Sequence, residues 1–234
     1  KNNKESFSKK IEDIVKKDYN LVVTENFEIL VDILKKFKNE IKFKDIIKNI
    51  IRGSQKTISK FKSEEETPYI YLSLSDINDG LIEFENIENY LKEIPENQEK
   101  FLVKNECILL SKYGKSPKLA IVKNLGEEKV IASGNLIIIE VDKKEIDPYY
   151  LAALFSSSKG TEILKEAYSN SKNGSLSIKK LEEVMIPVHS KKVQEKISYE
   201  YFEILSDIEK EKTKLKKLLE NIDMTDVKKK FLKK

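Results

Sequence analysis

The hydrophobic residues of this chain follow three different patterns in succession. Over residues 1–38 they recur three and four positions apart in two short stripes, among many Lys, Glu and Asn residues. This spacing predicts helix, because residues three and four apart share one helix face. The stripes are too thin to bury a core by themselves. Residues 1–38 are therefore expected to be a helical linker.

Over residues 39–190 the hydrophobic positions form short runs rich in β-branched and aromatic residues, bounded by Gly, Pro, Asn and Asp. All 7 glycines and all 5 prolines of the chain lie in this region. Such runs are typical of strands separated by turns. The predicted strands are Tyr69–Ser73, Glu106–Leu110, Leu119–Val122, Val130–Ala132 and Leu136–Val141.

Two short helices are predicted after the last of these strands. Asp147 and Pro148 are typical of a helix N-cap followed by proline at the first helical position. The first helix is expected to turn its apolar residues inward, Leu151 and Phe155 among them, and the second to follow Gly160.

From residue 191 to 234 the apolar positions alternate spacings of four and three, which makes a heptad seam with one polar exception, Glu211. A continuous helix of about 30 residues would be roughly 45 Å long. Its seam must be buried on another helix, in the same molecule or in a partner; the alternative is a helix folded back on its own domain. We predict that the seam forms a homodimer through Ile197, Tyr201, Ile204, Ile208, Leu215, Leu218 and Ile222.

Together the three patterns predict a mixed α+β fold. A small twisted β-sheet domain with short helices occupies residues 39–190, and a long heptad-patterned C-terminal helix occupies residues 191–234.

Composition limits the chemistry that the chain can perform. The 44 basic and 40 acidic residues leave a net charge of +4, which permits nucleic-acid binding without arguing for it.

The single cysteine, Cys107, cannot form an internal disulfide, so a reducing, cytoplasmic compartment is expected. We expect Cys107 to be a buried structural thiol. With His189 as the only histidine, no zinc site is expected. No apolar run approaches the roughly 20 residues that span a bilayer. Because Lys1 is not preceded by a methionine, the chain is expected to be a piece of something longer.

One motif invites a catalytic interpretation. Asp147-Pro148-Tyr149-Tyr150 is similar to the Asn/Asp-Pro-Pro-Tyr/Phe motif of amino-methyltransferases, but the second proline is missing. No glycine-rich loop follows a strand to hold S-adenosylmethionine, since the glycines are scattered singly. A helix cap explains Asp147 and Pro148 without chemistry, so we expect no catalytic residue.

Three polar loops, around residues 52–57, 111–118 and 168–177, carry the candidate binding residues. Lysines and hydroxyls contact phosphates, and tyrosine stacks or donates hydrogen bonds. Arginine and glutamine recognise the edges of guanine and adenine. Each loop alone could equally be a plain surface loop; together they predict a nucleic-acid-binding surface. Its residues are Arg52, Gln55, Lys56, Ser111, Lys112, Tyr113, Lys115, Lys118, Lys172, Asn173 and Ser175.

Several of these segments occur in an order that resembles a known family. Leu110–Lys115, Gly134–Ile139, Asp147–Leu151 and Gly174–Leu181 follow one another as in the target-recognition domain of the specificity subunit of type I restriction-modification enzymes. The resemblance extends from about Ile41 to Leu219. It implies a DNA target-recognition domain at residues 39–190 followed by a long conserved helix. It also implies double-stranded DNA as ligand and a methyltransferase subunit, with or without a restriction subunit, as partner.

The chain departs from that family in two ways. Full specificity subunits carry two recognition domains and two long helices, whereas this chain carries one of each. Residues 11–27, with Asp18-Tyr19-Asn20-Leu21, resemble the tail that follows the catalytic domain of type I modification subunits. The chain is therefore expected to be the C-terminal part of a fused methyltransferase-specificity protein, with S-adenosylmethionine bound on the associated methyltransferase domain and no cofactor here.

The expected function is sequence-specific DNA recognition for a restriction-modification adenine methyltransferase, without catalysis. The alternative is a helical protein-interaction or scaffold module that makes no DNA contact. Salt-dependent DNA binding distinguishes the two, because phosphate contacts make log affinity fall with log salt.

Overall fold

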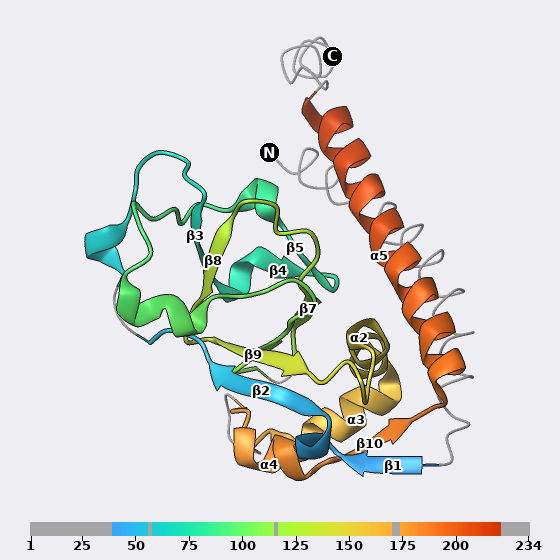
Figure 1. The fold of residues 1–234 in the computed structure, drawn as a ribbon. Coiled ribbons are helices and arrows are strands. Elements are labelled where there is room, and N and C mark those ends of the chain that lie inside the picture. Colours follow the sequence, from blue (N-terminus) through green and yellow to red (C-terminus); the bar gives the residue numbers. More distant parts are fainter. Residues whose placement is uncertain (1–38, 56–57, 115–116, 170–173, 221–234) are drawn as a thin grey trace, which may run out of the picture.

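The computed structural model describes residues 39–55, 58–114, 117–169 and 174–220, with the backbone alone for 218–220. The helical linker expected at residues 1–38 lies outside these ranges. The strands and helices of Figure 1 follow in the order β1 (Asn39–Lys42), β2 (Ile47–Arg52), β3 (Tyr69–Leu72), β4 (Ile77–Asn78), β5 (Leu81–Ile82), β6 (Ile108–Ser111), β7 (Leu119–Ile121), β8 (Lys129–Ala132), β9 (Leu136–Val141), α2 (Pro148–Ser156), α3 (Ser158–Ala167), α4 (Ile178–Glu183), β10 (Met185–Val188) and α5 (Lys191–Glu220).

The mixed α+β fold is confirmed, and each strand predicted from the sequence is present within two residues of its expected bounds. The principal sheet has four antiparallel strands in the order β2-β9-β6-β7. Two-stranded pairs surround it: β3 with β8 in parallel, and β4 with β5 and β1 with β10 antiparallel. The β1–β10 pair joins the first and last strands of the described domain, and α5 starts three residues after it.

Strand β9 is central to the sheet and is buried on both of its faces. Ile137 and Ile139 point to the core formed with the helices, whereas Leu136 and Ile138 point to a second core beneath β3 and β8. Successive side chains of a strand face opposite sides, so a strand covered on both sides reads as an uninterrupted apolar run. This burial explains the sequence Leu-Ile-Ile-Ile.

Helix α2 begins at the predicted N-cap. The Asp147 Oδ1 atom accepts hydrogen bonds from the backbone N–H of Tyr149 at 2.8 Å and of Tyr150 at 3.1 Å. It also accepts one from Ser198 Oγ of α5 at 2.5 Å. Tyr150 is fully buried and donates to the carbonyl of Pro187 at 2.7 Å. The methyltransferase-like motif therefore has a structural role, and the expected inward direction of Leu151, Leu154 and Phe155 is confirmed.

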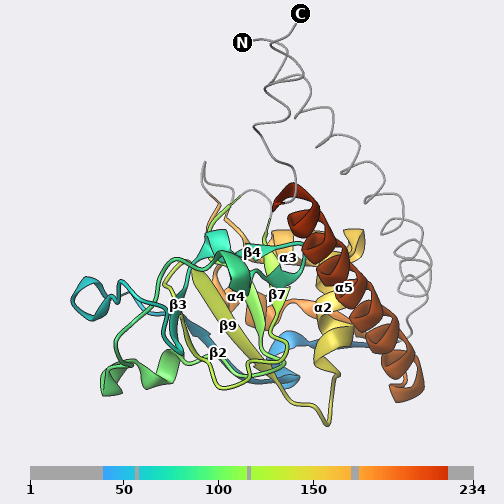
Figure 2. The ribbon, with the colours of Figure 1, turned by 90° about the horizontal axis from the view of Figure 1, so that it is seen from above.

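Helix α5 is the predicted long helix, with 30 residues, and the first half of its heptad seam is covered by its own domain. In both ribbon views α2 lies between the sheet and α5 (Figures 1 and 2). Ile197, Tyr201, Ile204 and Ile208 are 0%, 2%, 9% and 5% exposed within the core that contains α2. The prediction that these four residues form a dimer interface is therefore wrong, because the same chain already buries them.

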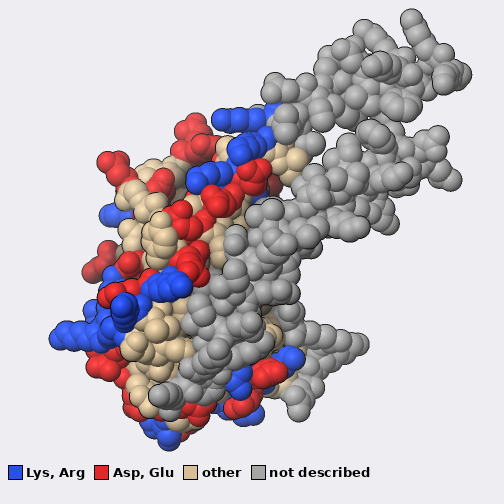
Figure 3. Space-filling model, turned by 90° about the vertical axis from the view of Figure 1, so that its right-hand side faces the viewer, with Lys and Arg blue, Asp and Glu red and all other residues tan. Residues whose placement is uncertain are grey.

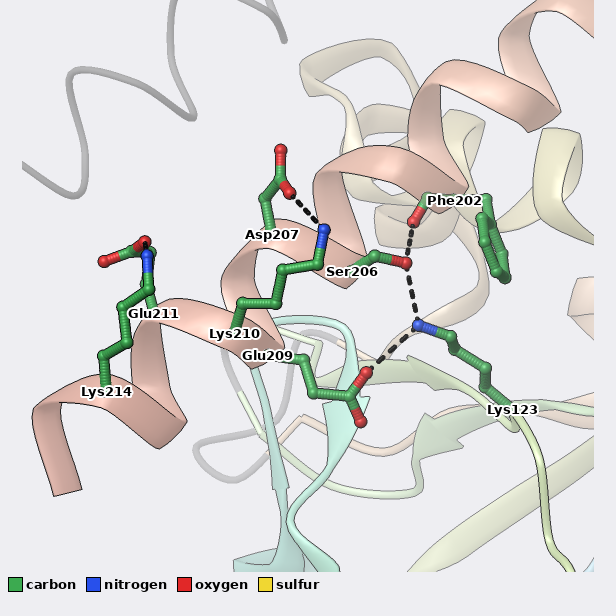
Figure 4. A network of polar contacts seen from close by, with 8 residues as sticks. All are labelled: Lys123, Phe202, Ser206, Asp207, Glu209, Lys210, Glu211 and Lys214. Atoms are coloured by element: carbon green, nitrogen blue, oxygen red, sulfur yellow. Dashed lines mark hydrogen bonds and ion pairs between the residues drawn. The ribbon is translucent and has the colours of Figure 1, made fainter. Parts of the chain in front are cut away.

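The rest of the predicted seam contacts the domain less closely. Leu215 is half-buried, and Leu218 and Ile222 lie outside the described side chains. Glu211, the polar residue of the seam, pairs with Lys214 of the same helix (Figure 4).

Polar contacts hold the outer half of α5 to the sheet domain. Lys123, just after β7, donates from Nζ to Ser206 Oγ at 3.0 Å and to Glu209 Oε2 at 3.1 Å (Figure 4). Its ammonium group also lies 4.6 Å from the centre of the Phe202 ring. Further along the helix, Lys212 binds Glu83 at 2.7 Å beside the β4–β5 hairpin. These contacts fix the direction in which α5 leaves the domain.

If the domain itself covers the seam, truncating it must destabilise the monomer. We expect Ile204→Ala to lower the free energy of unfolding by about 2–5 kcal/mol, since a buried cavity is left behind. The matched change Leu215→Ala, on the same seam but half-exposed, should cost less than about 1 kcal/mol. Urea unfolding of the two variants measures both. Equal losses in the free energy of unfolding would contradict the prediction, because they would show that the domain buries Ile204 and Leu215 to the same extent.

Candidate nucleic-acid interface

The predicted loop at residues 52–57 starts where β2 ends, beside the first residues of β9. Figure 1 shows this edge of the sheet on the side of the domain away from α5. Gly53 donates its N–H to Leu136 O at 2.9 Å, and a Cβ atom on Gly53 would lie only 2.3 Å from Ser133 O. Only glycine permits so close an approach of two backbones. The end of β2 is thereby fixed against residues 132–136.

A second close approach joins the other two loops. A Cβ atom on Gly174 would lie 2.5 Å from Gly114 O, and Gly174 has a positive φ of 47°. Leu176 N donates to Lys112 O at 2.9 Å beside this contact. The segment that follows α3 is therefore attached to the loop between β6 and β7. In its turn that loop is attached to the start of β9, because Lys112 N donates to Asn135 O at 2.7 Å.

The three loops meet at Tyr113, whose side chain is 40% exposed. Arg52 donates from Nε to Gly134 O at 2.7 Å and from Nη2 to the Tyr113 hydroxyl at 3.2 Å. The ammonium group of Lys112 donates to Ser175 Oγ at 3.1 Å and to the carbonyl of Leu176. The Arg52 guanidinium and the Lys112 ammonium lie 5.6 Å and 5.7 Å from the centre of the Tyr113 ring. We call Arg52, Lys112, Tyr113 and Ser175 the tyrosine cluster.

Acidic side chains among the described residues do not neutralise the charges of the tyrosine cluster. Among the described residues, no carboxylate lies within ion-pair distance of Arg52 or Lys112, whose hydrogen bonds go to neutral oxygens. Helix α5 differs, because Lys210, Lys212 and Lys214 each pair with a carboxylate. Figure 3, seen from the α5 side, shows basic and acidic side chains interspersed. Local positive charge without a partner favours an anionic ligand.

The remaining predicted residues are placed as follows. Gln55 is exposed, beside Gly134. Lys118 is exposed too, but its ammonium group donates to Ile77 O at 3.0 Å, toward β4. Ser111 is only 1% exposed, so its predicted contact with DNA is wrong. Lys56, Lys115, Lys172 and Asn173 lie outside the described residues.

Ser111 is instead part of the support beneath the tyrosine cluster. Its Oγ atom accepts from Lys118 N at 3.0 Å, and its carbonyl accepts from the hydroxyl of Tyr168. Burial raises the pKa of Tyr168, which keeps that donor protonated.

Sequence reasoning assigned no site role to the segment Ser133-Gly134-Asn135, which supplies two backbone carbonyls to the tyrosine cluster. The sequence did contain a signal for such close backbone contacts, because each loop carries a glycine next to or within two residues of a candidate side chain.

Nothing in the described part of the chain provides a metal centre or a reactive thiol. No group of three or more His, Cys, Asp or Glu side chains there could hold a metal ion. Cys107 is 2% exposed, as expected for a structural thiol, and burial raises its pKa to about 11. None of the helices in the described ranges is long and apolar enough to cross a bilayer.

Comparisons with known proteins identify the family of the chain. Residues 35–222 match the family described as the type I restriction modification DNA specificity domain. No curated protein sequence matches the chain.

Solved structures of low sequence identity share the fold. A structure reported under complex assembly and conformational transition of the type I R-M system has a TM-score of 0.56 at 12% identity, over 92% of this chain and 52% of that one. The type I restriction-modification S subunit from M. genitalium has a TM-score of 0.53 at 16% identity, over 94% and 58%. The HsdS subunit from Thermoanaerobacter tengcongensis has a TM-score of 0.51 at 12% identity, over 90% and 49%.

The chain thus spans about half the length of each of these proteins. The family match covers both the sheet domain with its tyrosine cluster and most of α5. On this evidence the chain belongs to the type I restriction modification DNA specificity domain family.

Proposed function

We propose that this chain recognises a DNA sequence on behalf of a restriction-modification adenine methyltransferase and performs no catalysis itself. The observation that carries the proposal is the tyrosine cluster: two cations to which the described residues offer no acidic partner, anchored by three loops on one exposed tyrosine. Membership of a DNA specificity domain family supports DNA as the ligand of that cationic surface.

The partner is a methyltransferase domain or subunit, with or without a restriction subunit. S-adenosylmethionine binds on that partner, and the assembly acts in the cytoplasm. The similarity to type I R-M proteins supports this assignment. So does the structural role of Asp147 and Tyr150, which are committed to capping and packing α2.

Two recognition domains are proposed to act together in a homodimer. Each matched structure is about twice as long as the region that it shares with this chain, since the chain covers 52%, 49% and 58% of them. Because the first half of the α5 seam is covered, the contact is proposed to involve the helix from Leu215 onward. A two-fold protein would bind two inverted half-sites.

The DNA-binding proposal is tested through Lys112. Its ammonium group is proposed to contact phosphate, so Lys112→Ala should weaken binding to every duplex alike. The slope of log affinity against log salt should fall by about 1, as for the loss of one phosphate contact. Fluorescence anisotropy with a labelled duplex at several salt concentrations measures both. Lys210→Ala, which breaks an exposed pair with Asp207 on α5, is the matched control and should change neither quantity. Absence of duplex binding at any salt concentration would favour the scaffold alternative.

The dimer proposal is tested by sedimentation equilibrium at micromolar concentrations. The chain should sediment as a dimer, and Leu215→Asp should shift it to a monomer with unchanged helix content by circular dichroism. A wild-type monomer that binds one half-site with full affinity would contradict the proposal.

A further inference from the structure

Arg52 is the only arginine among the 44 basic residues of the chain. At every other cationic position lysine is used. The two side chains differ in geometry: lysine presents a point charge, whereas the planar guanidinium presents a rigid fork of donors. Position 52 is therefore the one cationic position of this lysine-rich chain at which the planar guanidinium geometry can contribute to binding.

The structure shows how that fork is held. Nε donates to Gly134 O at 2.7 Å and Nη2 to the Tyr113 hydroxyl at 3.2 Å. These contacts anchor one edge of the guanidinium. Among the described residues no acceptor takes a hydrogen bond from Nη1. A guanidinium has five N–H donors, so Nη1 and the second hydrogen of Nη2 remain for a ligand, and the side chain is still partly exposed.

The anchor itself is rigid because it is made of backbone. Gly134 O belongs to the segment against which the chain packs at Gly53, with no room for a Cβ atom there. Tyr113 is fixed by a bridge to Ser175 and by the Arg52 and Lys112 cations on its ring. Both acceptors are neutral, so the positive charge of Arg52 is undiminished.

We infer that Arg52 recognises one guanine of the target sequence through Nη1 and Nη2; this inference rests on the proposed function. In the major groove, guanine presents two acceptors, O6 and N7, at the spacing of the arginine fork. Adenine presents one acceptor and one donor there, and Arg52 has donors only. Lys112, beside it on the same ring, supplies the charge for the neighbouring phosphate. Tyr113 is a positioning residue, whose hydroxyl orients the fork.

The test begins with duplexes selected from a random library by the wild-type chain. The selected site should contain a required guanine. Arg52→Ala, which removes the fork, should lower discrimination at that base pair by about 5- to 150-fold, the range for one bidentate contact. Preference at the other positions should be unchanged.

Modified bases provide an independent measurement on the unaltered protein. Replacing each guanine in turn by 7-deazaguanine removes N7, and wild-type affinity should fall several-fold at the one required position. In Arg52→Ala the same replacement should have no effect. Tyr113→Phe, which removes only the hydroxyl acceptor, should lower guanine discrimination with little loss of affinity for unselected DNA. Thermal unfolding of each variant verifies that the domain remains folded.

The outcomes separate the inference from the proposed function. If Arg52→Ala keeps every base preference, or weakens all duplexes alike as the loss of a phosphate contact would, the inference is overturned and the DNA-binding function stands. If the wild-type chain enriches no sequence from the library, the proposed function fails and the inference with it.

Discussion

The burial of β9 on both faces is the constraint on which the rest of this structure depends. Its residues join the two cores, and its pairing with β2 and β6 builds the sheet. One end of the strand starts at the Gly134 crossing, where Arg52 is anchored. After its other end the chain turns into the Asp147 cap, which α5 contacts through Ser198. A strand of 6 residues separates these two places, about 20 Å at the usual rise. The recognition loops and the long helix are thus attached to one inflexible element.

The local distribution of charge distinguishes the tyrosine cluster from α5 more clearly than the net charge of the chain does. Along the described part of α5, five lysines pair with carboxylates: Lys196, Lys210, Lys212, Lys214 and Lys216. Exposed pairs of this kind contribute little to stability, but each offsets a positive charge that could attract DNA. At the tyrosine cluster the two cations are held by carbonyl and hydroxyl oxygens instead. The net charge of +4 does not show this difference. It is a sum over the whole chain, in which the excess positive charge of the small tyrosine cluster is combined with the nearly equal positive and negative charges of the larger surface.

Local features of this fold were predictable from the sequence, and features set by distant contacts were not. The Asp147 cap and the apolar run of β9 depend on neighbouring residues, so both were foreseen. The heptad seam of α5 correctly indicated a buried face, but a pattern cannot say what covers it; α2 does. Ser111 was expected to be an exposed loop residue from its polar neighbours in the sequence. It is buried instead, in hydrogen-bond contact with Tyr168, which lies 57 residues away in the sequence. The meeting of three loops at Tyr113 likewise depends on glycine contacts between segments far apart in the sequence.

In the proposed function the tyrosine cluster, and not α5, faces the DNA. Site-specific photocrosslinking tests it most directly, with a benzophenone amino acid in place of Tyr113 or of Tyr199, the 67% exposed tyrosine of α5. On irradiation with the selected duplex, we expect a protein–DNA crosslink from position 113 and none from position 199. A crosslink from position 199 alone would contradict it.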